Sequence, residues 1–529
     1  MSEDRGTALA PGRRSLSLAA PRWSAAAWSA IALTAASIAL SCWWLAEDRG
    51  IPGMEPGTIL TDALATHATL ARGDLLGPLS EVAIHPPLVR VVGAIGMLIG
   101  GVNVTAPVIA EVLVFMPLLA LGCYRAGALV GGPRAGALAT AFALGTPLMV
   151  ESFHVLMLDA PEAALVAVSA WLVLASDRFS DERRSLLAGL AVGLALLAKQ
   201  QSALCLAGLV VVVILRGHGW RNRRGILRFA LGALVVAGPW YAIHLHHLGV
   251  NEALVGTSVP GTDPPTLSLT NLGWYVWAAL NGELLAPLFV LAAIGIATAT
   301  VRTLRGRAGP WVPELLCGML LAWIALLATP IHVVRYQLPL IVYLAVLGTI
   351  WIVKLGPLGR SVAVASLALA LAASVLGSTF GVGGEVRVPL VRRLPTDRTV
   401  LGVAPTDQIV LYSNRVFQLS GPRRGDDFLA LLRALHRRGI EQVTWLPWQQ
   451  ELYDFNHYGI DVMIAMAGMG TLPSFDPQHM PPGTALLLRD GTHRSPPCVR
   501  LAGGHAVWVV IGGARTDATP AFCPTRGGA

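Results

Sequence analysis

Charged residues are scarce in this 529-residue chain: they make up 13% of it, against 54% for apolar residues, and the mean hydropathy is +0.61. This scarcity excludes one water-soluble core with a solvated surface, because there is too little polar side-chain area to cover it. Something other than water must solvate most of the chain. The composition therefore predicts an integral membrane protein.

Several signatures of soluble enzymes are also absent. The sequence has no Walker loop, no dinucleotide-binding glycine fingerprint, no His-Glu-x-x-His and no Gly-x-Ser-x-Gly in a suitable context. The net charge is +8, yet no basic cluster is interleaved with aromatic residues as nucleic-acid binding requires. These absences disfavour nucleotide-dependent chemistry and nucleic-acid partners.

Long apolar blocks are present instead, and most approach the 17–25 residues that cross about 30 Å of hydrocarbon. The block Leu186–Leu215 is too long for one crossing and has Lys199 in its middle, so we predict two short helices with a turn at Lys199. Eleven spanning helices are then expected from the blocks Trp23–Leu45, Thr105–Cys123, Ala135–Met149, Pro161–Ala175, Leu186–Leu215, Ile226–Leu245, Ala286–Val301, Pro313–Thr329, Leu338–Val353 and Ser361–Phe380.

Basic residues predict the orientation, because Lys and Arg beside short loops stay in the cytoplasm. With the N-terminus inside, the inner segments collect nineteen Lys and Arg residues, whereas the outer loops before residue 381 hold five. We therefore expect a cytoplasmic tail over residues 1–22, a membrane domain over 23–380 and a C-terminus outside. The excess of arginine over lysine is typical of a high-GC bacterium, which suggests its cytoplasmic (inner) membrane.

Two regions outside the membrane are predicted on the outer face: a loop with surface helices over residues 47–103, and a small α/β or α+β domain over 381–529. The domain's expected strands are Gln408–Ser413, Gln442–Leu446, Asp461–Ala465, Ala485–Leu488 and Ala506–Ile511, with a helix at Asp426–Arg438. Cys498 and Cys523 both fall in this domain, where an oxidising compartment permits a disulfide between them. The fold class is thus a mainly α transmembrane bundle with a small outer domain.

Short motifs on the predicted outer face resemble the GT-C superfamily of membrane glycosyltransferases, in particular aminoarabinose transferases and protein O-mannosyltransferases. The motifs occur in the family's order over about residues 23–380. They are an acidic residue soon after the first helix followed by His85-Pro86-Pro87-Leu88, then Asp159-Ala160-Pro161, the segment Leu190–Lys199, Pro239-Trp240-Tyr241, and Arg335-Tyr336-Gln337-Leu338-Pro339.

The resemblance implies an inverting transfer of a sugar from a polyprenyl-phosphate donor to a glycan, lipid or protein acceptor. The family's first-loop acid is an Asp-Glu pair, and here Met54 stands in the Asp place. Glu55 is therefore the first choice of catalytic base, with Asp62 and Asp48 as alternatives and Asp159 assisting. Lys199, Arg335, His85 and Tyr336 are expected to bind the donor phosphate.

Simpler interpretations of these residues stay open. Asp159 could simply cap the N-terminus of the helix that continues through Pro161, and Asp62 could be a solvated or capping residue. Lys199 could extend its ammonium to the phosphate of an ordinary phospholipid. The histidines His244, His246 and His247 lack a convincing further ligand, so no metal site is predicted and no cofactor is certain. A divalent metal remains an alternative, since some relatives carry one near the active site.

Two other function classes compete with a glycosyltransferase. A transporter usually shows internal repeats and charges near the middle of the membrane, whereas here the charges gather at one face and no repeat is evident. Because Met54 stands where the family has an Asp, an inactive scaffold or sensor of the same fold stays an alternative. The sugar, the acceptor and the length of the lipid do not follow from the sequence.

Overall fold

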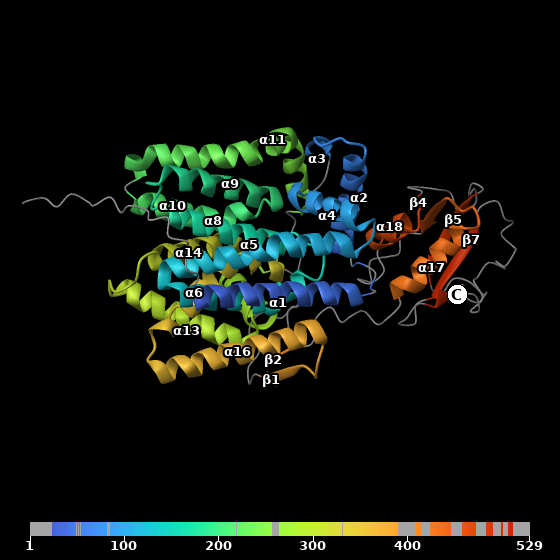
Figure 1. Cartoon of the computed structure of the whole chain (residues 1–529). Helices are drawn as coiled ribbons and strands as arrows, with labels where there is room; N and C mark the ends of the chain where they lie inside the picture. Colours follow the sequence, from blue (N-terminus) through green and yellow to red (C-terminus); the bar gives the residue numbers. More distant parts are fainter. Residues whose placement is uncertain are drawn as a thin grey trace, which may run out of the picture.

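The computed structural model places the chain in a helical bundle with a smaller α/β unit at one end (Figure 1). It describes residues 24–48, 50, 52, 54–81, 85–217, 219–255, 264–330, 332–389, 408–413, 424–445, 457–471, 483–489, 499–500 and 506–511. The predicted cytoplasmic tail, Cys498 and Cys523 lie outside these residues.

The bundle is built from long helices joined by short connections. Its elements are α1 (Ala25–Glu47), α5 (Thr105–Gly131), α6 (Pro133–Gly145), α7 (Pro147–Ser152), α8 (Asp159–Ala175), α9 (Glu182–Ala198), α10 (Ser202–Arg216), η1 (Gly219–Asn222), α11 (Arg223–Val255), α12 (Leu269–Ala278), η2 (Ala279–Glu283), α13 (Leu285–Leu304), α14 (Val312–Leu327), η3 (Val334–Leu340), α15 (Ile341–Thr349), η4 (Ile352–Lys354) and α16 (Pro357–Phe380).

Every predicted apolar block overlaps at least one of these helices, and the long block is divided as expected. α9 ends at Ala198, Lys199 adopts an extended conformation with φ −159°, and α10 begins at Ser202. Among the described residues, six helical segments are long and apolar enough to span a membrane: Ala25–Glu47, Thr105–Gly131, Arg223–Leu245, Leu285–Leu304, Val334–Lys354 and Pro357–Phe380. A multi-span helical membrane protein is thus confirmed, and eleven crossings stay a prediction.

Helix α8 forms the centre of the bundle. Nearly all of its side chains are buried, and it packs against α5, α9, α10, α15 and η3. Small residues permit this close approach: a Cβ on Gly122 of α5 would lie only 2.5 Å from the backbone of Ala167 in α8. The polar N-terminus of α8, with Asp159 and Glu162 in its first turn, is therefore fixed among apolar helices.

Three helices form the predicted outer loop at one end of the bundle. They are α2 (Met54–Ala71), the single turn α3 (Gly77–Ser80) and α4 (Leu88–Gly100), and α2 packs on α4. At about 1.5 Å per residue, the 13 residues of α4 extend roughly 20 Å, less than the hydrocarbon thickness. The helical character expected of this loop is confirmed.

The smaller unit has a five-stranded mixed sheet in the order β4-β3-β5-β7-β6. Parallel pairing joins β3 to β4 and β5, whereas β7 is antiparallel to β5 and β6. The strands are β3 (Gln442–Trp445), β4 (Gly470–Thr471), β5 (Thr484–Arg489), β6 (Val499–Arg500) and β7 (Ala506–Ile511), with helices α17 (Arg424–His436) and α18 (His457–Met466).

The predicted strand Asp461–Ala465 is wrong, because these residues belong to α18. Val462 packs with the core of the bundle, whereas Met463 and Ile464 pack with the core of the smaller unit. A helix buried on two faces has no wide polar stripe, so the 3.6-residue period was not visible in five residues.

The predicted strand Gln408–Ser413 exists as β2 (Gln408–Tyr412), but it does not join the mixed sheet. It pairs antiparallel with β1 (Val386–Pro389), and Val410 donates its backbone N–H to Asn281 Oδ1 at 2.8 Å. This hairpin therefore packs on the bundle. The helical segment α12 with the π-helical turn η2 was missed by the sequence analysis, because its polar residues interrupt the apolar pattern.

Candidate active site

Asp159 is the centre of a cluster of charges at the outer-loop end of the bundle. Its side chain is 2% exposed, and Oδ1 lies 2.7 Å from Lys199 Nζ. Oδ2 lies 3.1 Å from Arg335 Nε. One buried carboxylate therefore holds two cations from two distant segments, the α9–α10 turn and η3.

Glu55 completes the cluster from the first turn of α2. Its carboxylate forms an ion pair with the Arg335 guanidinium. The Glu55 side chain is 43% exposed and that of Arg335 is 25% exposed, in contrast to the buried Asp159. The cluster thus has a closed side at Asp159 and an open side at Glu55.

Tyr336 lies directly above the ammonium. Lys199 Nζ is 4.5 Å from the centre of its ring, a cation–π distance. Gln201 donates from Nε2 to the Tyr336 carbonyl oxygen at 3.2 Å, which joins the α9–α10 turn to η3. These contacts hold the two cations at a fixed separation.

Two further acids near the cluster were not predicted. Glu162 lies 3.7 Å from Lys199 Nζ and accepts a hydrogen bond from the Ser202 hydroxyl at 3.2 Å. Glu111 of α5 accepts the backbone N–H of Met157 at 3.2 Å, just before α8 begins. Glu162 could have been found from its i, i+3 spacing to Asp159 on the same helix face, whereas Glu111 carries no local signal.

His85 lies within electrostatic reach of Lys199, Asp159 and Arg335. The pKa of His85 is lowered to about 4, chiefly by burial and also by the two nearby cations, while Asp159 opposes the shift. His85 is therefore neutral at pH 7. Its Nδ1 atom is buried and has no hydrogen-bond partner among the described residues, so it can serve a bound group.

Asp62 belongs to a different group. The charges that act on it are Arg90 and Glu81, which form an ion pair at 3.1 Å, and neither Lys199 nor Arg335 is among them. The pKa of Asp62 is raised to about 6, chiefly by burial, while Arg90 opposes the rise and Glu81 adds to it. The structure thus brings Glu55, Asp159, Lys199, Arg335, Tyr336 and His85 together and leaves Asp62 outside this cluster.

His244 of α11 does not form a metal site with other described residues. No group of three His, Cys, Asp or Glu side chains with metal-binding geometry occurs in the part of the chain that the structure describes. His244 stacks on Trp240 with 4.6 Å between ring centres, and its Nε2 lies 3.2 Å from the Glu81 carbonyl oxygen. The side chains of His246 and His247 lie outside the described residues.

The cluster has the chemistry of a phosphate site with an adjoining base. Lys199 supplies a point charge and Arg335 a planar fork that matches phosphate oxygens. Glu55 lies on the open side, where a carboxylate can take a proton from a bound hydroxyl. Asp159 has both oxygens occupied by cations and is less suited to accept a proton.

One protein-family description matches part of the chain. Residues 84–243 match the family described as dolichyl-phosphate-mannose-protein mannosyltransferase, and this segment includes His85, Asp159 and Lys199. No curated protein sequence matches the chain.

Solved structures resemble the chain at low sequence identity. ArnT from Cupriavidus metallidurans bound to undecaprenyl phosphate has a TM-score of 0.51 and 17% identity, over 67% of this chain and 66% of that one. The apo state of the same protein has a TM-score of 0.49 and 18% identity, over 67% of this chain and 65% of that one. The apo oligosaccharyltransferase of Archaeoglobus fulgidus has a TM-score of 0.40 and 14% identity, over 64% of this chain and 56% of that one. The chain thus spans slightly less than two thirds of the length of ArnT, and the resemblance to the GT-C superfamily is confirmed at the level of the fold.

Proposed function

We propose that this GT-C chain is a membrane glycosyltransferase that moves a sugar from a polyprenyl-phosphate donor to an acceptor on the outer face of a bacterial inner membrane. The observation that carries the proposal is the pairing of Lys199 and Arg335 on one buried carboxylate, Asp159. Five distant segments contribute to this site: α2, the segment before α4 that carries His85, the N-terminus of α8, the α9–α10 turn and η3.

The proposed orientation follows from the distribution of charge. The site lies at the end of the bundle that holds α2, α3 and α4 (Figure 1). The opposite end carries most of the bundle's arginines, including Arg178, Arg216 and Arg228. Because basic loops stay in the cytoplasm, the site faces outward, where a lipid-phosphate sugar is available and nucleotide sugars are scarce.

The donor phosphate is proposed to bind between Lys199 and Arg335. An ammonium and a guanidinium stabilise the two negative charges that remain on the lipid phosphate when the sugar leaves. Neutral His85 donates a hydrogen bond from its unpaired Nδ1 to a phosphate oxygen, and Tyr336 orients the Lys199 ammonium. In ArnT, undecaprenyl phosphate is the bound group, which supports a lipid phosphate as the ligand of this fold.

Glu55 is proposed as the base. Without donor it is paired with Arg335, and a bound phosphate competes for that guanidinium and frees the Glu55 carboxylate. The acceptor hydroxyl then attacks the anomeric carbon on the face opposite the phosphate and gives its proton to Glu55. The bond from the anomeric carbon to the phosphate oxygen breaks, its electron pair stays on that oxygen, and the configuration is inverted.

Asp159 is proposed to position the two cations. Its oxygens contact Lys199 and Arg335 and its side chain is nearly inaccessible, so it holds the phosphate-binding groups in place. This role is compatible with its position in the first turn of α8, where the helix dipole favours a negative charge. Asp62 lies with Arg90 and Glu81, apart from the phosphate-binding groups, and is proposed to have no part in the transfer.

The smaller C-terminal unit is proposed to hold α2 in place. Its helix α18 packs against α2, and Val462 belongs to the same buried core as Ile59 and Ala63. The contact lies on the helix that carries Glu55. The unit thereby fixes the base relative to the phosphate site.

Transfer of radiolabelled sugar from native membrane lipid extracts by the purified protein tests the proposal. Wild type should transfer label, and Lys199→Ala should lose it while remaining folded. Arg72→Ala is the matched control, since it removes an exposed cation of the same outer loop and should retain transfer. Equal activity in Lys199→Ala and wild type would contradict the proposed phosphate site, and no transfer from any lipid-linked donor would favour a scaffold.

A further inference from the structure

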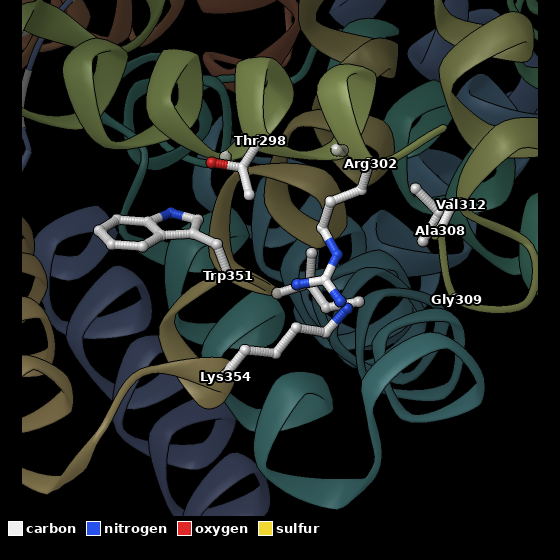
Figure 2. Close-up of a pocket in the computed structure, with 10 residues that line it drawn as sticks. Thr298, Arg302, Ala308, Gly309, Val312, Trp351 and Lys354 are labelled. Carbon is white, nitrogen blue, oxygen red and sulfur yellow. The ribbon is translucent and has the colours of Figure 1, made fainter. Parts of the chain in front are cut away.

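A second charged site lies at the far end of the bundle from Arg335. Arg335 lies near the start and Lys354 at the end of the helical stretch Val334–Lys354, whose 21 residues extend roughly 30 Å. Near Lys354 a small pocket lies between the end of α13, the α13–α14 loop and η4. Its walls include Thr298, Arg302 and Trp351 (Figure 2).

Two cations meet in this pocket from different elements. Figure 2 shows the Arg302 side chain extending from α13 and Lys354 from η4, with their charged ends beside each other. Arg302 is close enough to exert a repulsive electrostatic effect on Lys354. Lys354 Nζ is also 4.0 Å from the position that a Cβ on Gly309 would take, which places the ammonium against the loop.

Neither cation has a counter-charge within the described part of the chain, where neither side chain forms an ion pair or hydrogen bond. The carboxylate in the first turn of α14, Glu314, is already engaged by Arg178 at 3.1 Å and by Arg216 at 3.3 Å. Both side chains are exposed, so an anion from outside the chain can reach them and offset their mutual repulsion.

We propose that this pocket binds a phosphate group, and that its source is the phosphodiester of an anionic membrane lipid in the inner leaflet. Arg302 supplies a planar fork and Lys354 a point charge for the phosphate oxygens. Trp351, fixed by a hydrogen bond from Nε1 to the Gly348 carbonyl oxygen at 2.7 Å, is typical of the membrane–water interface. Basic pockets between helices on the cytoplasmic side suit lipid headgroups.

The inference is independent of the proposed sugar transfer. The pocket shares no residue with the cluster around Asp159 and lies near the other end of the bundle. Binding there joins α13, the α13–α14 loop and η4 through one ligand. Lipid binding at this site therefore anchors the inner end of the bundle to the membrane.

Native mass spectrometry of the purified protein tests the proposal. The protein is mixed with equal amounts of phosphatidylglycerol and phosphatidylcholine, and retained lipids are counted. Wild type should retain phosphatidylglycerol preferentially, and the double variant Arg302→Gln/Lys354→Gln should lower that retention at least about tenfold, because two charge-assisted contacts are lost. The double variant Arg305→Gln/Arg307→Gln removes the same charge from the adjoining loop and should retain it.

Calorimetric titration with inorganic phosphate distinguishes the source of the anion. If inorganic phosphate binds through Arg302 and Lys354 and displaces phosphatidylglycerol, the phosphate chemistry holds and free phosphate is also a ligand. Two results together would overturn the proposal. The first is that phosphatidylglycerol retention is equal in all three proteins, or is lowered equally by both double variants. The second is that inorganic phosphate binding does not depend on Arg302 and Lys354. Elution volume and thermal midpoint verify that each variant is folded.

Discussion

Replacing Asp159 with Asn should leave Lys199 and Arg335 facing each other without their shared counter-charge. In the wild type, Lys199 Nζ lies 2.7 Å and Arg335 Nε 3.1 Å from the carboxylate. The Asp159 side chain is 2% exposed and that of Lys199 is 10% exposed, so water cannot replace the lost anion readily. We predict that Asp159→Asn is strongly destabilising and has greatly reduced sugar transfer.

The magnitude follows from the burial of the pair. Removing one partner of a buried ion pair costs about 3–5 kcal/mol, because the remaining charge is left uncompensated. Glu162, 3.7 Å from Lys199 Nζ, retains part of the attraction and places the expected loss near about 3 kcal/mol. An exposed pair should lose far less: Asp181→Asn removes the partner of Arg184, whose side chain is 57% exposed, and should cost below about 1 kcal/mol.

A double variant separates stability from function. Asp159→Asn/Lys199→Gln leaves no unpaired ammonium, so it should regain much of the stability that Asp159→Asn loses, but it should not regain transfer. Unfolding is followed by heat or denaturant in one detergent, and transfer by labelled sugar. The reasoning is refuted if Asp159→Asn is as stable as wild type, or if the double variant transfers sugar normally.

Three further changes probe separate parts of the structure. Arg335→Lys should weaken the apparent affinity for a lipid-phosphate donor about tenfold, because an ammonium lacks the guanidinium fork, as measured by the dependence of transfer rate on donor concentration. The pKa of Asp62 is raised to about 6, so the wild type should lose stability as pH rises from about 4 through 6 and this carboxyl ionises. Asp62→Asn should remove this loss, as measured by thermal unfolding at pH 4.5 and pH 8. Gly189→Ala should destabilise by about 1–3 kcal/mol, because its Cβ would lie 2.0 Å from a backbone oxygen of α11, whereas Gly273→Ala meets no atom within 4 Å and should be neutral in the same unfolding assay.

The bundle could be predicted from the sequence because a membrane imposes strong rules. Apolar blocks of spanning length and the position of basic residues have few alternative explanations, and the turn at Lys199 followed from a charge inside a block of thirty residues. The same rules do not apply to α12, whose polar residues and tryptophans show no apolar block, or to α18, which packs on two sides.

The site was partly predictable, because its cations and acids lie in recognisable motifs. Glu55, Asp159, Lys199 and Arg335 are far apart in the sequence, and the resemblance to the GT-C superfamily brought them together. The pairings of these charges could not be predicted. The packing of α2, α4 and η3 decides that Asp159 holds two cations and that Asp62 lies with Arg90. Sequence spacing contains no information on such long-range contacts.

The central claim is tested most directly by the rate of sugar transfer in Glu55→Gln, measured with saturating polyprenyl-phosphate donor. If Glu55 is the base, transfer should fall by about 10²–10⁴-fold while donor affinity changes little, since Gln keeps the size of Glu but cannot accept the proton. Glu47→Gln, which neutralises an exposed carboxylate at the end of α1, should keep wild-type activity. A wild-type rate in Glu55→Gln would contradict the assignment of the base.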